Sequence, residues 1–116
     1  MRRSALKQYF CLVILATLLL AGCGSGDEIT IRTAGMRFLQ DELHVKAGQA
    51  VTLHVVNRDG FAHTFDIDEF DIHAPLPAQA AFDAVFTPTE PGRYRFYCGS
   101  PGHEAAGMVG LLVVEP

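Results

Sequence analysis

Short runs of alternating apolar and polar residues, separated by turn-forming residues, recur through most of this 116-residue chain. In the segment QAVTLHVVN, for example, Val51, Leu53 and Val55 share one face, as in a strand with one buried side. The breaks AGQ, NRDG and TPTEPG are rich in residues that form turns. We predict strands within residues 28–34, 42–48, 49–57, 62–68, 80–88, 92–98 and 108–115.

This pattern limits the fold class. About seven short strands without an amphipathic helix of useful length predict an all-β protein, an antiparallel sandwich or small barrel. Segment 69–80 is the least regular part, and its prolines Pro75 and Pro77 argue against a central strand there.

The first 22 residues have the composition of an export signal. Three basic residues and no acidic residue precede a fourteen-residue apolar run, which is short of the roughly 20 residues that span a bilayer. The run ends in LAGC, which resembles the lipobox of bacterial lipoproteins, where cleavage leaves a lipidated cysteine. We predict a signal peptide at 1–22, a lipidated tether at 23–28 beginning with Cys23, and one domain at 29–116. The alternatives are an ordinary signal peptide or an anchor helix with an unrelated cysteine. RRSALK also resembles a twin-arginine export signal.

Cleavage before Cys23 would remove three of nine basic residues and none of thirteen acidic ones, leaving a net charge of about −7. Such an acidic surface argues against nucleic acid as a partner. Cys11 would leave with the signal and Cys23 would carry lipid, so Cys98 would be the only thiol. A lone cysteine in an oxidising compartment is expected to be buried or bound.

Residues 97–110, YCGSPGHEAAGMVG, place three metal-ligand types in one loop. Four residues separate Cys98 from His103, and four separate His103 from Met108. Alternation on the preceding strand turns its arginines to water and Cys98 to the core. Two His, one Cys and a weak axial Met form the ligand set of blue-copper electron-transfer sites. Zinc prefers a closed tetrahedral site without Met.

The fourth ligand must then be a histidine from another strand. Alternation turns His63 inward with Phe65 and Ile67, and turns Thr64, Asp66 and Asp68 toward water. His44 and His54 fall on outward faces, and His73 lies in the proline-flanked irregular segment. His63 is therefore the predicted ligand.

VVNRDGFAHTFDID and FYCGSPGHEAAGMVG make the chain resemble the cupredoxins, the type 1 blue copper proteins that include plastocyanin, azurin and auracyanin. The resemblance runs from about residue 29 onward. It implies a cupredoxin-like Greek-key β-sandwich or barrel, in which one copper ion cycles between Cu(I) and Cu(II). It assigns the ligands to His63, Cys98, His103 and Met108, and makes the backbone N–H of Thr64 a donor to the thiolate. It makes His103 the electron port, surrounded by Pro101, Ala105, Ala106 and Gly107.

The implied function is non-enzymatic electron transfer between redox proteins outside the cytoplasm, by a monomer held on the periplasmic side of a membrane through its lipid anchor. The alternative is a periplasmic copper carrier or chaperone that uses the same site. Enzymes related to copper nitrite reductases or multicopper oxidases need additional copper sites and domains. A binuclear copper centre needs a second cysteine in the loop, and Gly99, Ser100, Pro101 and Gly102 supply none. A red-copper variant of the site, with a carboxylate ligand, is a further alternative, but it would give Met108 no role.

Overall fold

The computed structural model describes residues 26–116, and the predicted signal peptide and Cys23 lie outside the described residues. Within the described part, none of the helical structure is long and apolar enough to cross a membrane. The first strand begins at Asp27 and so includes the last two residues of the predicted tether.

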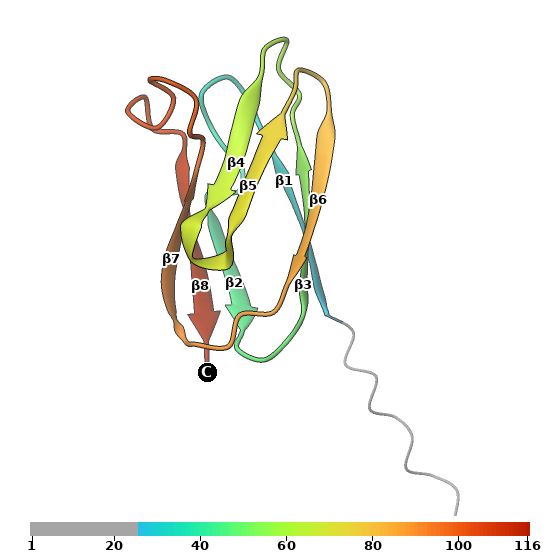
Figure 1. Cartoon of the computed structure of the whole chain (residues 1–116), viewed down its shortest axis with the longest axis vertical. Helices are drawn as coiled ribbons and strands as arrows, with labels where there is room; N and C mark the ends of the chain where they lie inside the picture. The colour runs from blue at the N-terminus through green and yellow to red at the C-terminus, as the bar shows by residue number, and fades with distance from the viewer. Residues whose placement is uncertain (1–25) are drawn as a thin grey trace, which may run out of the picture.

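Two sheets pack face to face (Figure 1). The three-stranded sheet has the order β1-β3-β6, and the five-stranded sheet has the order β2-β8-β7-β4-β5. One 3₁₀ turn, η1 (Asp68–Phe70), joins β4 to β5. The strands are β1 (Asp27–Arg32), β2 (Glu42–Lys46), β3 (Val51–Val56), β4 (His63–Ile67), β5 (Ile72–Leu76), β6 (Ala81–Phe86), β7 (Gly92–Tyr97) and β8 (Val109–Glu115). The predicted all-β sandwich is confirmed.

Strand direction differs in part from the antiparallel expectation. β1 pairs with β3 in parallel, and β2 pairs with β8 in parallel, while the remaining pairs are antiparallel. Alternating polarity reports which face of a strand is buried, and it carries no information about the direction of the neighbouring strand.

The core lies between the sheets and follows the predicted alternation. Val51, Leu53 and Val55 are fully buried, whereas Thr52 and His54 between them are only partly buried. On β7, Phe96 is fully buried and packs against Phe38 and Phe65. The other buried apolar residues in this core are Ile31, Leu43, Val45, Ile67, Leu76, Ala84, Cys98, Met108, Leu112 and Val114.

An eighth strand, β5, lies in the segment that looked irregular in the sequence. It contains Pro75 and pairs only with β4, at the edge of the five-stranded sheet. An edge strand has one unpaired side, so a residue without an N–H is tolerated there. The argument against a central strand is therefore correct, but the strand count of about seven is one too low.

The connections β1–β2, β3–β4 and β7–β8 meet at one end of the sandwich, uppermost in Figure 1. His63 begins β4 at this end, and Cys98 directly follows β7 there. All the predicted metal ligands therefore come from this end, which we call the ligand end.

Candidate metal centre

The β7–β8 connection carries Cys98, His103 and Met108 and is closed by backbone hydrogen bonds among them. The N–H of Cys98 donates to the carbonyl of Met108 (3.1 Å), and the N–H of Met108 donates to the carbonyl of His103 (3.0 Å). Gly102 and Gly107 have φ values of +81° and +102°, which glycine adopts without steric cost. The loop is thus a compact turn that brings three ligand-type residues together.

Three ligand atoms from two parts of the chain converge at this end. The Nδ1 atoms of His63 and His103 lie 3.0 Å apart. The Sγ atom of Cys98 lies 3.4 Å from Nδ1 of His103 and 3.9 Å from Nδ1 of His63. These separations allow one metal ion to contact all three atoms, which lie within 4.8 Å of one another. A thiolate with two imidazoles also fits copper by ligand type.

The candidate ligands differ in how deeply they are buried. Cys98 and Met108 are fully buried and His63 is 2% exposed, whereas His103 is only partly buried. Met108 lies beside the group through its backbone bonds to Cys98 and His103. One imidazole therefore reaches toward solvent while the other groups are shielded from it.

The sulfur of Cys98 accepts a hydrogen bond from the chain itself. The backbone N–H of Thr64 donates to Sγ (3.3 Å), and the hydroxyl of Thr64 lies 3.9 Å from the same atom. A donor at this position stabilises negative charge on sulfur. Thr64 thus has the contact that the sequence resemblance implied for it.

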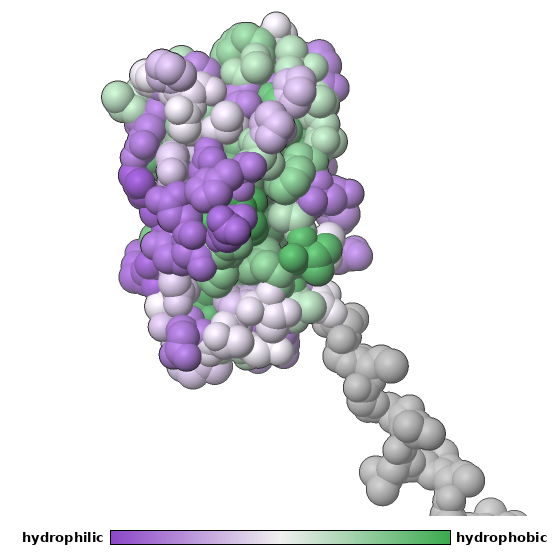
Figure 2. Space-filling view, viewed as in Figure 1, coloured by the Kyte–Doolittle hydropathy of each residue, from purple (hydrophilic) through white to green (hydrophobic). Residues whose placement is uncertain are grey.

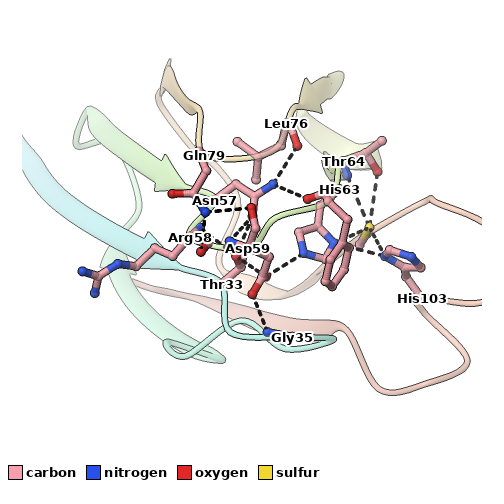
Figure 3. Close-up of polar contacts among 12 residues, drawn as sticks. Thr33, Gly35, Asn57, Arg58, Asp59, His63, Thr64, Leu76, Gln79 and His103 are labelled. Atoms are coloured by element: carbon pink, nitrogen blue, oxygen red, sulfur yellow. Dashed lines mark hydrogen bonds and ion pairs between the residues drawn. The ribbon is translucent and has the colours of Figure 1, made fainter.

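A carboxylate holds the other nitrogen of His63 (Figure 3). Nε2 of His63 lies 2.8 Å from Oδ2 of Asp59, so Nε2–H donates to the carboxylate and the Nδ1 lone pair is left toward Cys98. The side chains of His63 and Asp59 are 0% and 13% exposed. Burial alone would raise the pKa of Asp59, but hydrogen bonds from Thr33, His63 and Gly35 lower it below its ordinary value. The group is therefore a charged acceptor.

The Asp59 carboxylate is fixed by the loop that follows β1. The hydroxyl of Thr33 lies 2.7 Å from Oδ2 of Asp59 and 2.9 Å from Oδ1 of Asn57, and it donates to one of them at a time. The N–H of Gly35 donates to Oδ1 of Asp59 (2.8 Å).

Asn57 ties the same turn to the end of β5. Its side-chain nitrogen donates to the carbonyls of Phe61, Leu76 and Pro77, over 2.9–3.1 Å (Figure 3). Asn57 is 1% exposed. These contacts make the β3–β4 connection a rigid support for His63.

Phe61 packs against both imidazoles. Its ring centroid lies 5.0 Å from that of His63 and 6.2 Å from that of His103, in edge-on arrangements. Phe61 is itself 46% exposed. Nothing in the spacing of the sequence distinguished this aromatic residue from an ordinary loop residue.

Asp66 differs from the expectation that the polar face of β4 is open to water. Its side chain does lie on the face opposite Phe65, but Asp66 is only 9% exposed. Its carboxylate accepts from the hydroxyl of Thr64 (2.5 Å) and the N–H of Gly99 (3.1 Å), and it contacts His73 at 3.0 Å. Period two assigns a face, but the neighbouring strands decide whether that face is covered.

The surface around Asp66 and His73 is strongly hydrophilic. Figure 2 shows hydrophilic residues gathered over the β4–β5 turn, where Asp68 and Asp71 follow Asp66. His73, on β5, faces all three of these carboxylates, at 3.0–4.0 Å.

His44 and His54 were predicted to face outward from their strands, and their side chains are 53% and 38% exposed. His44 contacts Glu42 and Glu115, and hydrogen bonds to these carboxylates raise its pKa above 6.5. His54 on β3 contacts Asp83 on β6 at 2.7 Å.

Comparison with known proteins places this architecture in a family. A family model described as "Cupredoxin-like domain" matches residues 9–114. The chloroplastic plastocyanin minor isoform of Arabidopsis thaliana is 30% identical, over 97% of this chain and 73% of that protein. Rusticyanin of Acidithiobacillus ferrooxidans is 33% identical, over 63% of this chain and 49% of that protein.

Solved structures share the fold. An auracyanin of Roseiflexus castenholzii superposes with a TM-score of 0.71 at 22% identity, covering 80% of this chain and all of that one. Auracyanin A of Chloroflexus aurantiacus, described as a "blue" copper protein, gives 0.69 at 22% identity, covering 78% and 100%. A copper nitrite reductase of Nitrosomonas europaea gives 0.71 at 19% identity, but this chain covers only 42% of it.

The structural similarities show the fold, and the sequence matches extend over most of the chain. They confirm the resemblance drawn from residues 55–68 and 96–110. The protein is therefore a member of the cupredoxin family of blue copper proteins.

Proposed function

We propose that this protein is a non-enzymatic carrier of single electrons, with a type 1 copper site formed by His63, Cys98, His103 and Met108. The observation that carries the proposal is the buried Cys98 sulfur, within 3.4–3.9 Å of two imidazole nitrogens. Copper supplies the redox chemistry by cycling between Cu(I) and Cu(II). Imidazole suits both states, and the soft sulfur ligands suit Cu(I), so one fixed ligand set serves both.

The chain's own contribution is to keep this ligand set in place. The backbone N–H of Thr64 remains on the sulfur, and Asp59 keeps Nδ1 of His63 directed toward Cys98. Preorganisation of this kind limits the structural change that accompanies each electron transfer.

Electrons enter and leave, in this proposal, through His103. It is partly exposed, and small residues of the same loop are exposed around it, namely Pro101, Ala105, Ala106 and Gly107. Small side chains allow a partner surface to approach the imidazole closely. The proposed partners are redox proteins that donate and accept single electrons.

A visible absorption spectrum of the copper-loaded protein tests the site. An intense thiolate-to-copper charge-transfer band is expected. Cys98→Ser should abolish the band, because Cys98 is the only free thiol in the described residues. The variant should still fold, because serine is nearly isosteric with cysteine. A coloured Cys98→Ser protein would contradict the proposal.

The same preparation distinguishes a copper carrier that delivers its ion from an electron carrier. Slow copper loss to a chelator, together with reversible voltammetry, is expected for the shielded thiolate described above. Fast copper transfer would favour the delivery role.

We also propose that the protein is exported and anchored by lipid at Cys23, on the evidence of its N-terminal sequence. Mass spectrometry of the mature N-terminus should find a lipidated cysteine there. An unmodified Cys23 in mature protein would reject the anchor and leave the electron-transfer proposal standing.

A further inference from the structure

Asp59 is the one carboxylate that directly contacts a proposed copper ligand in the described residues. It is 2.8 Å from Nε2 of His63. It lies four residues before His63, in a turn that the sequence presented only as a loop. We propose that Asp59 is a positioning residue that fixes the His63 ring and biases the copper site toward Cu(II), thereby lowering the reduction potential. This inference rests on the proposed copper site.

Hydrogen bonding supplies the first part of the argument. A ligand histidine whose second nitrogen donates to a carboxylate has a fixed tautomer and a more basic metal-binding nitrogen. Asp59 cannot easily turn away from His63, because Thr33 and Gly35 hold its two oxygens. A more basic imidazole favours the more highly charged ion.

Charge supplies the second part. With the Cys98 thiolate and the Asp59 carboxylate both ionised, the site carries two negative charges. These charges balance Cu(II), whereas with Cu(I) one negative charge remains in excess. A buried excess charge is costly, and burial also limits screening by salt. Asp59 therefore opposes reduction.

The chain offers a matched control for this contact. Asp83 and His54 form a pair of the same residue types at 2.7 Å, but their side chains are 66% and 38% exposed. Exposed ion pairs contribute little, because water screens them. Asp83→Asn therefore removes the same charge from a similar contact that involves none of the proposed ligands.

The test compares copper-loaded Asp59→Asn and Asp83→Asn with the parent protein. Voltammetry gives the reduction potential, and competition with chelators gives the affinity for each oxidation state. Asp59→Asn should weaken Cu(II) binding about tenfold more than Cu(I) binding, which corresponds to a rise of about 59 mV for a one-electron couple. Asp83→Asn should change neither quantity. If Asp59→Asn weakens both oxidation states equally, with no change in potential, Asp59 is only structural and the inference fails.

A second variant covers the case in which Asp59→Asn does not fold. Thr33→Val keeps the carboxylate and removes the hydroxyl that holds its Oδ2, so the contact between Asp59 and His63 loosens. The potential should then rise, in the same direction as for Asp59→Asn. An unchanged or lowered potential would overturn the inference. A parent protein that forms no coloured copper centre would instead refute the proposed function.

Discussion

Two histidine–aspartate pairs in this protein have nearly the same contact distance and very different surroundings. His63 meets Asp59 at 2.8 Å at the ligand end, and His54 meets Asp83 at 2.7 Å across β3 and β6. The side chain of His63 is fully buried, whereas that of His54 is 38% exposed. A close contact between histidine and aspartate therefore does not by itself mark a metal site in this protein. Burial and the neighbouring thiol distinguish the proposed metal ligand His63 from the surface histidine His54.

The largest expected effect is on the stability that copper binding adds, and it should distinguish His63 from His54. With free copper at about a thousand times its dissociation constant, binding to the native state should add about 4 kcal/mol to the free energy of unfolding. His63→Ala should lose most of this gain, and His54→Ala should keep it. Unfolding measured with and without copper checks the prediction, and equal behaviour of the two variants would remove the distinction between the two pairs.

A smaller effect, on the reduction potential, is expected from replacing methionine. Met108 and Met36 differ in burial, as His63 and His54 do. Met108 is fully buried at the ligand end, and Met36 is 36% exposed. Met-to-Leu exchange conserves volume and usually costs less than about 1.5 kcal/mol, so both proteins should fold. If Met108 is the weak axial ligand, Met108→Leu should raise the reduction potential, because Cu(II) needs the axial donor more than Cu(I) does.

Met108→Gln sharpens the same comparison. It replaces sulfur with a harder oxygen donor, which favours Cu(II), so the potential should fall. Met36→Leu should leave the potential unchanged. Voltammetry on all three variants decides the matter, and unchanged potentials at both Met108 variants would make Met108 a core residue and leave three ligands.

The smallest effect concerns His44, a third histidine with carboxylate partners. Glu42 and Glu115 raise the pKa of His44 above 6.5, so the folded state binds its proton more tightly than the unfolded chain does. The resulting stability is fully present below about pH 6.5 and is lost as pH rises through the folded-state pKa. In metal-free protein, His44→Gln should therefore lower the urea midpoint at pH 5.5 and barely change it at pH 8.5. An equal change at both pH values would exclude this linkage.

Much of the fold was predictable because strand burial is a local property. Val51, Leu53 and Val55 share a buried face, and Cys98 points inward from the end of β7, as alternation alone indicated. The edge strand β5 was not predicted, since Pro75 obscures its pattern. The burial of Asp66 was also not predicted, because it depends on contacts of its carboxylate with His73 on a neighbouring strand and with Thr64 and Gly99.

The sequence by itself determined the strand faces, the ligand types and the candidate set His63, Cys98, His103 and Met108. These follow from short-range spacing, which the chain carries whatever its neighbours are. Only the tertiary structure decided the parallel pairing of β1 with β3 and the contact between Asp59 and His63. The physical reason is that Asp59 is held by Thr33 and Gly35, some 24 to 26 residues earlier in the chain. Their approach exists only after β1 has paired with β3 and the loops that follow these two strands have met at one end.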